Sequence, residues 1–426
     1  MTTATHTSPP HPVLDGLDAL IKPLENLYRD LHAHPELSDQ EHRTAAKAAE
    51  QLEWAGCEVT TRIGGTGVVG VLRNGDGPTV MLRADMDALP VKEDTGLSYA
   101  STATATDPDG HTVPVMHACG HDMHVTWLAG ATKLLARAPE AWRGTLISLF
   151  QPAEELGTGA QGMIDDHLFD RLPKPDVILG QHVMPPPAGQ ITYRAGVTQS
   201  EEDNIEVRLF GRGGHGAWPE STIDPVVMAA AAVLRLQTVV SREIAAFEPA
   251  VVTVGSLQAG AKGNVIPDEA VLKINVRSFD DGVRARVLAA IKRIVTAEAA
   301  ASGAPEPPSF TSFDHFDLTI NDPATTHHVG DAFRAYFGAD RVAELTDPLP
   351  VSEDFGLFGQ EWKVPSLFWY VGGTDPGVYQ RAVKAGRIAQ DVPTNHSSKF
   401  APVLHPTLET GIQTLAAASL SYLGSR

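Results

Sequence analysis

The chain is poor in cysteine: only Cys57 and Cys119 occur among its 426 residues. A secreted protein held together by disulfides would carry many more cysteines, so we expect a protein of the reducing cytoplasm. The N-terminus, MTTATHTSPPHPVLDG, has neither a basic region nor an apolar segment. We therefore expect no signal peptide there, and a loose tail over the first dozen residues.

Long apolar runs and positive charge are also scarce. No run of 18 apolar residues occurs, which predicts no membrane span. Lys and Arg number 33 against 52 Asp and Glu, a net charge of −19. Nucleic acids and anionic membrane surfaces bind basic patches, so this balance argues against both as partners. The length instead favours a protein of two globular domains.

The hydrophobic pattern divides the chain into two kinds of segment. Residues 14–33 carry apolar groups at helical spacing, and Ser38 with Glu41 three residues later predicts a capping box that opens a second helix. Over residues 1–194, and again over 315–426, apolar strands alternate with helices. This order is typical of an α/β domain whose mixed sheet is mostly buried and flanked by helices.

Residues 195–314 follow another order, β-α-β-β-α-β, which is typical of a small α+β ferredoxin-like sandwich. We therefore expect this domain to be inserted between the two halves of the α/β domain.

Residue types that bind metals recur at the ends of the predicted strands. In open α/β sheets, binding sites lie at the carboxyl ends of the strands. The candidates at these positions are Asp85, Asp87, Cys119, His121, Asp122, Glu154, Glu155, His182 and His396.

Each of these candidates has a simpler explanation when taken alone. A single histidine at a strand end is usually an ordinary hydrogen-bonded group, and Cys119 alone is more often a small buried hydrophobe. The acidic pair Glu154–Glu155 alone suits the first turn of a helix. Together, however, they favour a common site, because four separate segments end on the same kind of edge.

Four roles are open to Cys119: a nucleophile, a metal ligand, a disulfide partner of Cys57, or a small core residue. A nucleophile with His121 as its base leaves Glu154 and Glu155 without a role. A thiolate combined with imidazole and carboxylate ligands fits a zinc-type metal, and a thiolate can bridge two cations. Two metal ions polarise a carbonyl and lower the pKa of water, and a glutamate that is not a ligand can then carry the proton.

Seven motifs carry a resemblance to a known family: RADMDALP, HACGHDMH, PAEE, QHVMP, GRGGHG, NVIPD and SEDFG. With these motifs in order from about residue 30 to 405, the chain resembles the aminoacylase and carboxypeptidase-G2-like dinuclear metallohydrolases. More narrowly, it resembles their hippurate-hydrolase and auxin-conjugate amidohydrolase branch. The resemblance implies a metal-dependent amidohydrolase acting on N-acyl amino acids. The alternatives are a dipeptidase or carboxypeptidase of the same fold, and an inactive binding or sensor protein on this scaffold.

The resemblance also implies roles for individual residues. It implies two divalent metal ions per chain, with Zn²⁺ favoured and Mn²⁺, Co²⁺ or Ni²⁺ as alternatives. Glu154 would be the general acid/base, and Asp85 would orient a metal-bound group. The implied ligands are Cys119, His121, Glu155, His182 and His396.

For the inserted domain, 195–314, the resemblance implies a lid that also joins two chains into a homodimer. His215 would stabilise the oxyanion in the site of the neighbouring subunit. Asn264 and Arg277, thirteen residues apart, would bind the carboxylate of the substrate. The catalytic, metal-binding domain would then be formed by residues 1–194 and 315–426.

Overall fold

The computed structural model of the protein describes residues 13–424, so the tail predicted over the first dozen residues lies outside the described part. The chain divides into two compact units. We call them the first unit (described residues up to 198, 320–347 and from 354 onward) and the inserted unit (199–319 and 348–353). The short segment 348–353 joins the inserted unit, which the sequence did not indicate.

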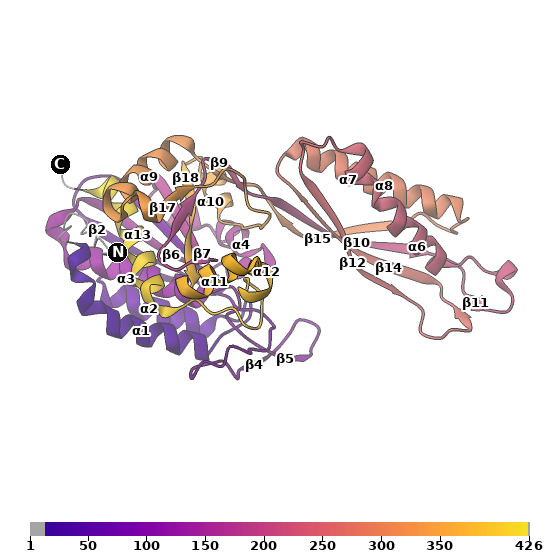
Figure 1. The fold of residues 1–426 in the computed structure, drawn as a ribbon, viewed down its shortest axis with the longest axis horizontal. Coiled ribbons are helices and arrows are strands. Elements are labelled where there is room, and N and C mark those ends of the chain that lie inside the picture. Colours follow the sequence, from indigo (N-terminus) through magenta and orange to yellow (C-terminus); the bar gives the residue numbers. More distant parts are fainter. Residues whose placement is uncertain (1–12, 425–426) are drawn as a thin grey trace. The chain divides into compact units, whose positions relative to one another are not determined.

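The first unit is built around an eight-stranded mixed sheet (Figure 1), with the strand order β1-β2-β6-β3-β7-β18-β8-β17. Its strands are β1 (Glu58–Ile63), β2 (Gly67–Asn74), β3 (Thr79–Asp85), β6 (Gly144–Gln151), β7 (Val177–Pro187), β8 (Ile191–Tyr193), β17 (Val342–Glu344) and β18 (Ser366–Thr374). Neighbouring strands β6, β3, β7 and β18 run parallel to one another. Their carboxyl ends therefore lie along one edge of the sheet, where sites form in such folds.

Helices flank this sheet, as the alternating pattern predicted. They are α1 (Asp18–Ala33), α2 (His42–Trp54), α3 (His121–Arg137), α4 (Gly159–Asp165), α5 (Leu168–Arg171), α9 (Pro323–Phe337), α10 (Gly356–Trp362), α11 (Pro376–Ala385), α12 (Ile388–Asp391) and α13 (Leu404–Leu423). Helix α3 is almost wholly buried and packs closely against α13. A Cβ atom at Gly411 would lie 2.0 Å from the ring of Trp127, so this approach requires glycine.

The start of α2 differs from the prediction. The predicted capping box is wrong, because the helix begins at His42 and the side chain of its N-cap residue, Glu41, makes no capping hydrogen bond. Glu36 accepts the backbone N–H groups of Arg43 and Thr44 instead, at 2.9 and 2.8 Å. Ser38 and Glu41 make their hydrogen bonds with residues far away in the sequence, near the candidate site.

The inserted unit has the predicted order of two βαβ halves. Its antiparallel sheet has the order β12-β14-β10-β15. In Figure 1 the helices lie along one face of it. The elements are β10 (Glu201–Phe210), α6 (Pro225–Leu236), α7 (Thr238–Glu243), β12 (Ala250–Ala259), β14 (Glu269–Ser278), α8 (Asp281–Ala301) and β15 (Ser309–Phe316). Aliphatic side chains of α6, α8 and the sheet form its core.

Three short strand pairs complete the part of the fold formed by residues 13–424. They are β4 (Thr104–Thr106) with β5 (Thr112–Pro114), β9 (Gly196–Gln199) with β16 (Thr319–Asn321), and β11 (Gly214–His215) with β13 (Val265–Ile266).

Among the described residues, one helical stretch, Pro225–Glu243, is long and apolar enough to cross a membrane by length and composition. This is weak evidence for a span, because the core helix of a globular domain passes the same test. Met228, Ala229, Ala232 and Leu236 in this stretch are fully buried within the inserted unit.

Candidate metal centre

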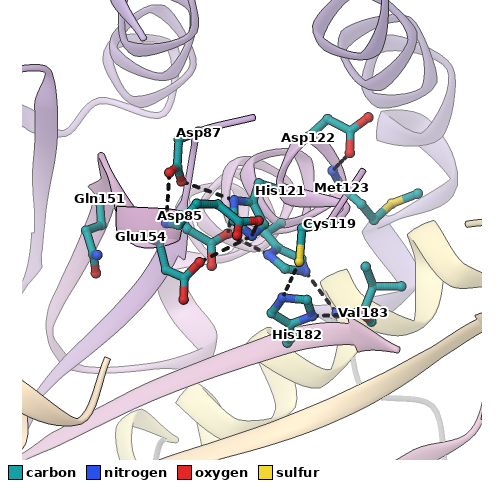
Figure 2. Close-up of polar contacts among 12 residues, drawn as sticks. Asp85, Asp87, Cys119, His121, Asp122, Met123, Gln151, Glu154, His182 and Val183 are labelled. Carbon is teal, nitrogen blue, oxygen red and sulfur yellow. Dashed lines mark hydrogen bonds and ion pairs between the residues drawn. The ribbon is translucent and has the colours of Figure 1, made fainter. Parts of the chain in front are cut away.

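Thiol, imidazole and carboxylate side chains gather at the carboxyl edge of the parallel strands (Figure 2). Cys119 lies just before α3, and its Sγ atom is 3.4 Å from Nε2 of His182 in β7. Gly120 makes this approach feasible. It has a φ of +87°, and a Cβ atom there would lie 2.4 Å from Cγ1 of Val183. The start of α3 is thereby held close to β7.

His182 is arranged to offer a lone pair to this group. Its Nδ1 atom is 2.7 Å from the carbonyl oxygen of Val183. A carbonyl only accepts, so Nδ1 carries the proton and Nε2 keeps its lone pair facing Cys119. Burial lowers the pKa of His182 well below its usual value and so favours this neutral form.

Two buried atoms of the group have no hydrogen-bond partner: Nε2 of His121 and Oε1 of Glu155, which are 3.8 Å apart. Buried polar atoms nearly always have a partner, so this pair demands an explanation. Ligand atoms of Cys119, His121 and Glu155 all lie within 4.8 Å of one another. Thiolate, imidazole and carboxylate together suit a zinc-type ion, so the donor set fits a metal.

His396 brings a fifth side chain to this group from the loop after α12. Its backbone is left-handed (φ +69°), and its N–H donates to the carbonyl of Ala118 at 2.8 Å. Its Nε2 atom is 3.4 Å from Oε2 of Glu155. Hydrogen bonds with Cys119 and Glu155 raise the pKa of His396 to about 11. The surroundings formed by Cys119 and Glu155 therefore favour a positive charge at this position, as a metal site does.

Asp87 is the carboxylate closest to His121. Its Oδ1 atom is 3.2 Å from Nδ1 of His121, whereas the nearest oxygen of Asp85 is 3.8 Å away. A hydrogen bond at Nδ1 orients the ring and leaves Nε2 available to a metal. Asp85 makes a shorter contact with His124, at 2.6 Å. The family resemblance gave the orienting role to Asp85, whereas in the structure Asp87, the second aspartate of RADMDALP, is the carboxylate nearer to His121.

The two glutamates of PAEE occupy a tight turn directly after β6. Ala153, before them, has a left-handed backbone with φ +48°, and Glu154–Leu156 form a single 3-10 turn. The N–H of Glu155 donates to Oδ2 of Asp87 at 2.9 Å. One oxygen of each glutamate is 3.8 Å from Nε2 of His121, and the buried Glu154 carboxylate lies beside that ring in Figure 2.

Asp85 belongs to a buried ion cluster beneath these groups. Arg83 donates to Asp85 at 2.6 Å, to Gln151 at 2.8 Å and to Asp354 at 3.1 Å. Although burial opposes ionisation, electrostatic interactions with His121, His124 and Arg83 and the hydrogen bond from His124 hold the pKa of Asp85 well below its usual value. Arg83 was not among the site residues predicted from the sequence, although its place was predictable: residues two apart on a strand share a face, so Arg83 and Asp85 lie together.

His117 is the first residue of the motif HACGHDMH. It is buried, and neither of its ring nitrogens has a hydrogen-bond partner. Burial lowers its pKa to about 4, so it is neutral. Cys57 and Cys119 are both free thiols, which excludes the disulfide alternative for Cys119.

The three candidates in the inserted unit do not form one group. His215 is exposed in the β11–β13 ribbon, opposite Val265. Asn264 is next to that pair, and its carbonyl accepts the N–H of Gly216 at 2.9 Å. His215 and Asn264 are therefore neighbours.

Arg277 lies near the C-terminal end of β14, whereas Asn264 precedes the start of that strand. Its guanidinium contacts Glu202 at 2.6 Å and Ser352 at 3.0 Å. Glu269 lies eight positions before Arg277 on the extended strand, a length of about 26 Å at about 3.3 Å per residue, and Asn264 lies beyond Glu269. Within one chain, Asn264 and Arg277 therefore cannot bind the same carboxylate.

Comparison with known proteins reveals relatives along nearly the whole chain. Residues 81–384 match the family described as peptidase family M20/M25/M40. The hippurate hydrolase of Campylobacter jejuni is 37% identical over 346 residues, which cover 81% of this chain and 87% of that protein. The N-acetylcysteine deacetylase of Bacillus subtilis is 34% identical over 391 residues, which cover 91% and 97%.

A solved structure extends the similarity to the fold. It is a dinuclear metal binding peptidase of the M20 family from Bacillus subtilis, with a TM-score of 0.73 and 29% identity. The match covers 95% of this chain and 99% of that one.

Proposed function

Because this chain belongs to peptidase family M20/M25/M40, we propose that it is a metal-dependent amidohydrolase that cleaves N-acyl amino acids. One observation carries the metal dependence. Nε2 of His121 and Oε1 of Glu155 are buried, face each other and lack hydrogen-bond partners. The relative described as a dinuclear metal binding peptidase supports two ions per chain.

We assign the metal ligands to the five side chains gathered at the sheet edge: Cys119, His121, Glu155, His182 and His396. Zn²⁺ suits this mixture of sulfur, nitrogen and oxygen donors best, with Mn²⁺, Co²⁺ and Ni²⁺ as alternatives. Metal ions bound there supply polarisation of the amide carbonyl and a water molecule of lowered pKa.

Glu154 is the residue that we assign to proton transfer. It is buried beside the ligand group but can remain outside the ligand set, because Glu155 supplies the carboxylate ligand. Glu154 accepts a proton from the attacking water and delivers it to the amide nitrogen. The carbon–nitrogen bond then breaks, giving a carboxylic acid and a free amine.

The substrate class follows from the relatives. Hippurate and N-acetylcysteine, the compounds in two of their names, are both N-acyl amino acids with a free carboxylate. Arg277 or Asn264 would bind that carboxylate through charge and hydrogen bonds. A dipeptidase would need an additional acidic group for the substrate's ammonium, and the sequence indicates none.

We further propose that two chains associate through the inserted unit, which would serve as a lid. If Asn264 and Arg277 both bind one substrate, they come from different chains, because β14 separates them within a chain. His215, the neighbour of Asn264, would then reach the partner's site and steady the oxyanion. Strand β12 is an edge of its sheet, and Val227 and Leu234 on α6 are 64% and 74% exposed. Exposed edges and apolar groups of this kind are suited to pairing.

A metal analysis combined with a substrate panel tests this function. N-acyl amino acids varied in both halves would be assayed beside dipeptides, before and after chelation. We expect about two ions per chain, hydrolysis of the acyl compounds and loss of activity on chelation. Glu154→Gln should keep its metal and lose about 10²- to 10⁴-fold in kcat. Activity that survives chelation would instead support Cys119 as a nucleophile.

A further inference from the structure

The segment HPELSDQE, residues 34–41, runs from the protein surface to buried residues next to the candidate metal centre. Glu36 caps α2 at its outer end. Ser38 donates to Oδ2 of Asp87 at 2.7 Å. Glu41 is fully buried, and both of its oxygens are engaged: Oε1 accepts the N–H of Ala153 at 2.8 Å, and Oε2 accepts the hydroxyl of Thr66 at 2.7 Å.

Ala153 is the residue that turns the chain between β6 and the two glutamates of PAEE. Its left-handed φ of +48° is unfavourable for a residue with a Cβ atom, so surrounding contacts must hold it. Its N–H donates to Glu41, and its carbonyl accepts the N–H of Gly159 at 3.1 Å. Because Glu154 and Glu155 follow directly, the conformation of Ala153 sets the direction of both carboxylates.

We propose that Glu41 is a positioning residue for catalysis: by holding the N–H of Ala153, it fixes the turn that directs Glu154 and Glu155 into the site. The proposal rests on the proposed function for the role of Glu154. Asp87 holds the other end of the same turn through the N–H of Glu155. Two buried carboxylates thus anchor the turn, one before the glutamate pair and one within it.

A purely structural role explains Glu41 less well. A buried carboxylate is costly, and burial together with the nearby charge of Asp87 raises the pKa of Glu41 to about 7. Glu36 already provides the cap of α2, so Glu41 is not needed to start the helix. An apolar side chain would fill the same volume at less cost but would not accept the N–H of Ala153.

Three single variants and one double variant test the proposal. Glu41→Leu removes the acceptor, and Glu41→Gln keeps it, since the amide oxygen can face Ala153 while the amide nitrogen donates to Thr66. Glu36→Leu is the matched control, because it removes a carboxylate that also accepts backbone N–H groups but at the outer end of the segment. Glu41→Leu with Ala153→Gly restores the turn by another route, because glycine adopts a left-handed backbone without strain.

For Glu41→Leu we expect kcat to fall about 100-fold at saturating metal, as for a misplacement of about 1 Å, with KM little changed. Because the same turn directs Glu155, Co²⁺ affinity measured from the absorption spectrum should fall about tenfold. Glu41→Gln should stay near the wild type on both measures, and so should Glu36→Leu, although it melts earlier. The double variant should recover about tenfold in kcat over Glu41→Leu.

Unchanged kcat and Co²⁺ affinity in folded Glu41→Leu would overturn the proposal. So would a Glu36→Leu variant impaired as much as Glu41→Leu, or a double variant with no recovery. If the wild type hydrolyses no N-acyl amino acid, the proposed function fails. The Co²⁺ titration still decides whether Glu41 positions the turn.

Discussion

The two units of this protein differ in which charged side chains they gather and which apolar side chains they expose. The first unit buries charged residues beside its sheet, among them Arg83, Asp85 and Asp87, each almost fully shielded from solvent. The inserted unit also buries carboxylates, among them Glu201, Glu202 and Asp203 at the start of β10, but the aliphatic side chains of Val227 and Leu234 on α6 are exposed.

This difference indicates where each unit carries its function. A buried charge is unfavourable unless it is paired, so a fold that gathers several of them is organised around what they hold. An exposed aliphatic residue contributes little to the fold that displays it and is available to another surface. The cluster of thiol, imidazole and carboxylate groups therefore favours chemistry in the first unit, and the exposed side chains of α6 favour association through the inserted unit.

Replacement of Arg83 is the test of this comparison with the largest expected effect. Arg83→Met leaves Asp85 and Asp354 buried without their cation, so we expect a loss of about 3–5 kcal/mol in the free energy of unfolding. Urea denaturation followed by circular dichroism measures it. Arg208→Met is the matched control, because Arg208 of the inserted unit pairs with Glu206 and Glu269 at the surface. It should change stability little. Equal effects of the two variants would remove the distinction between the units.

The next effect is a dependence of stability on pH. His32 of the first unit is fully buried, with Asp122 at 2.7 Å and Glu93 at 3.1 Å. Burial lowers its pKa, but these hydrogen-bonded carboxylates outweigh burial and raise it to about 9. A raised histidine pKa means that the folded state holds the proton more tightly. The stabilisation is complete below about pH 6.5 and is lost as the pH rises through about 9.

We expect this loss to be on the order of 3 kcal/mol, and His32→Gln should abolish it. His315 in the inserted unit is the comparison, because Asp203 and Asp317 raise its pKa to about 10. Its side chain is 36% exposed, so solvent weakens these pairs and His315→Gln should flatten the pH profile less. Urea denaturation at pH 6 and pH 9.5 tests both. A larger effect from His315 would contradict the expected order.

The sequence was sufficient to predict the fold because that information is local and periodic. Helix α1 buries Leu24, Leu27, Tyr28 and Leu31 at the spacing read from residues 14–33. The β-α-β-β-α-β order of the inserted unit is likewise confirmed. The sequence also predicted a common site for polar residues near the ends of separate strands, and the family resemblance implied that Cys119, His121, Glu155, His182 and His396 form it. The structure does bring them together, while their role as ligands stays a prediction.

The sequence was insufficient where one side chain had a choice of partners. Ser38 and Glu41 have the spacing of a capping box, but their partners are Asp87, Thr66 and Ala153, which no local rule connects to them. Asn264 and Arg277 are a different case. The family resemblance implied that they bind one carboxylate, and because an extended strand keeps them apart within a chain, that role stays a prediction for residues of two chains.

A smaller effect sharpens the assignment of Asp87. Asp87→Asn weakens the hydrogen bond that orients His121, so metal affinity should fall about 10- to 100-fold. Competition with a chromophoric chelator measures this affinity. The matched control is Asp268→Asn in the inserted unit, where Asp268 accepts the N–H of Gly213 at 2.8 Å. It should leave metal affinity unchanged, and a similar loss in both variants would mean that Asp87 acts only through the fold.

The smallest expected change in stability is that of Leu234→Lys on α6. Leu234 is 74% exposed, so its replacement should alter the free energy of unfolding of the monomer by less than about 0.5 kcal/mol. The same change introduces a charge into the surface that we propose joins two chains. The dissociation constant of the dimer, measured by analytical ultracentrifugation, should therefore rise. Leu236→Lys, two residues along the helix, is the matched control because Leu236 is fully buried. It should destabilise the inserted unit itself. If Leu234→Lys were equally destabilising and left association unchanged, the exposed aliphatic residues of α6 would serve the fold of the inserted unit. The proposed association through this unit would then lose its support.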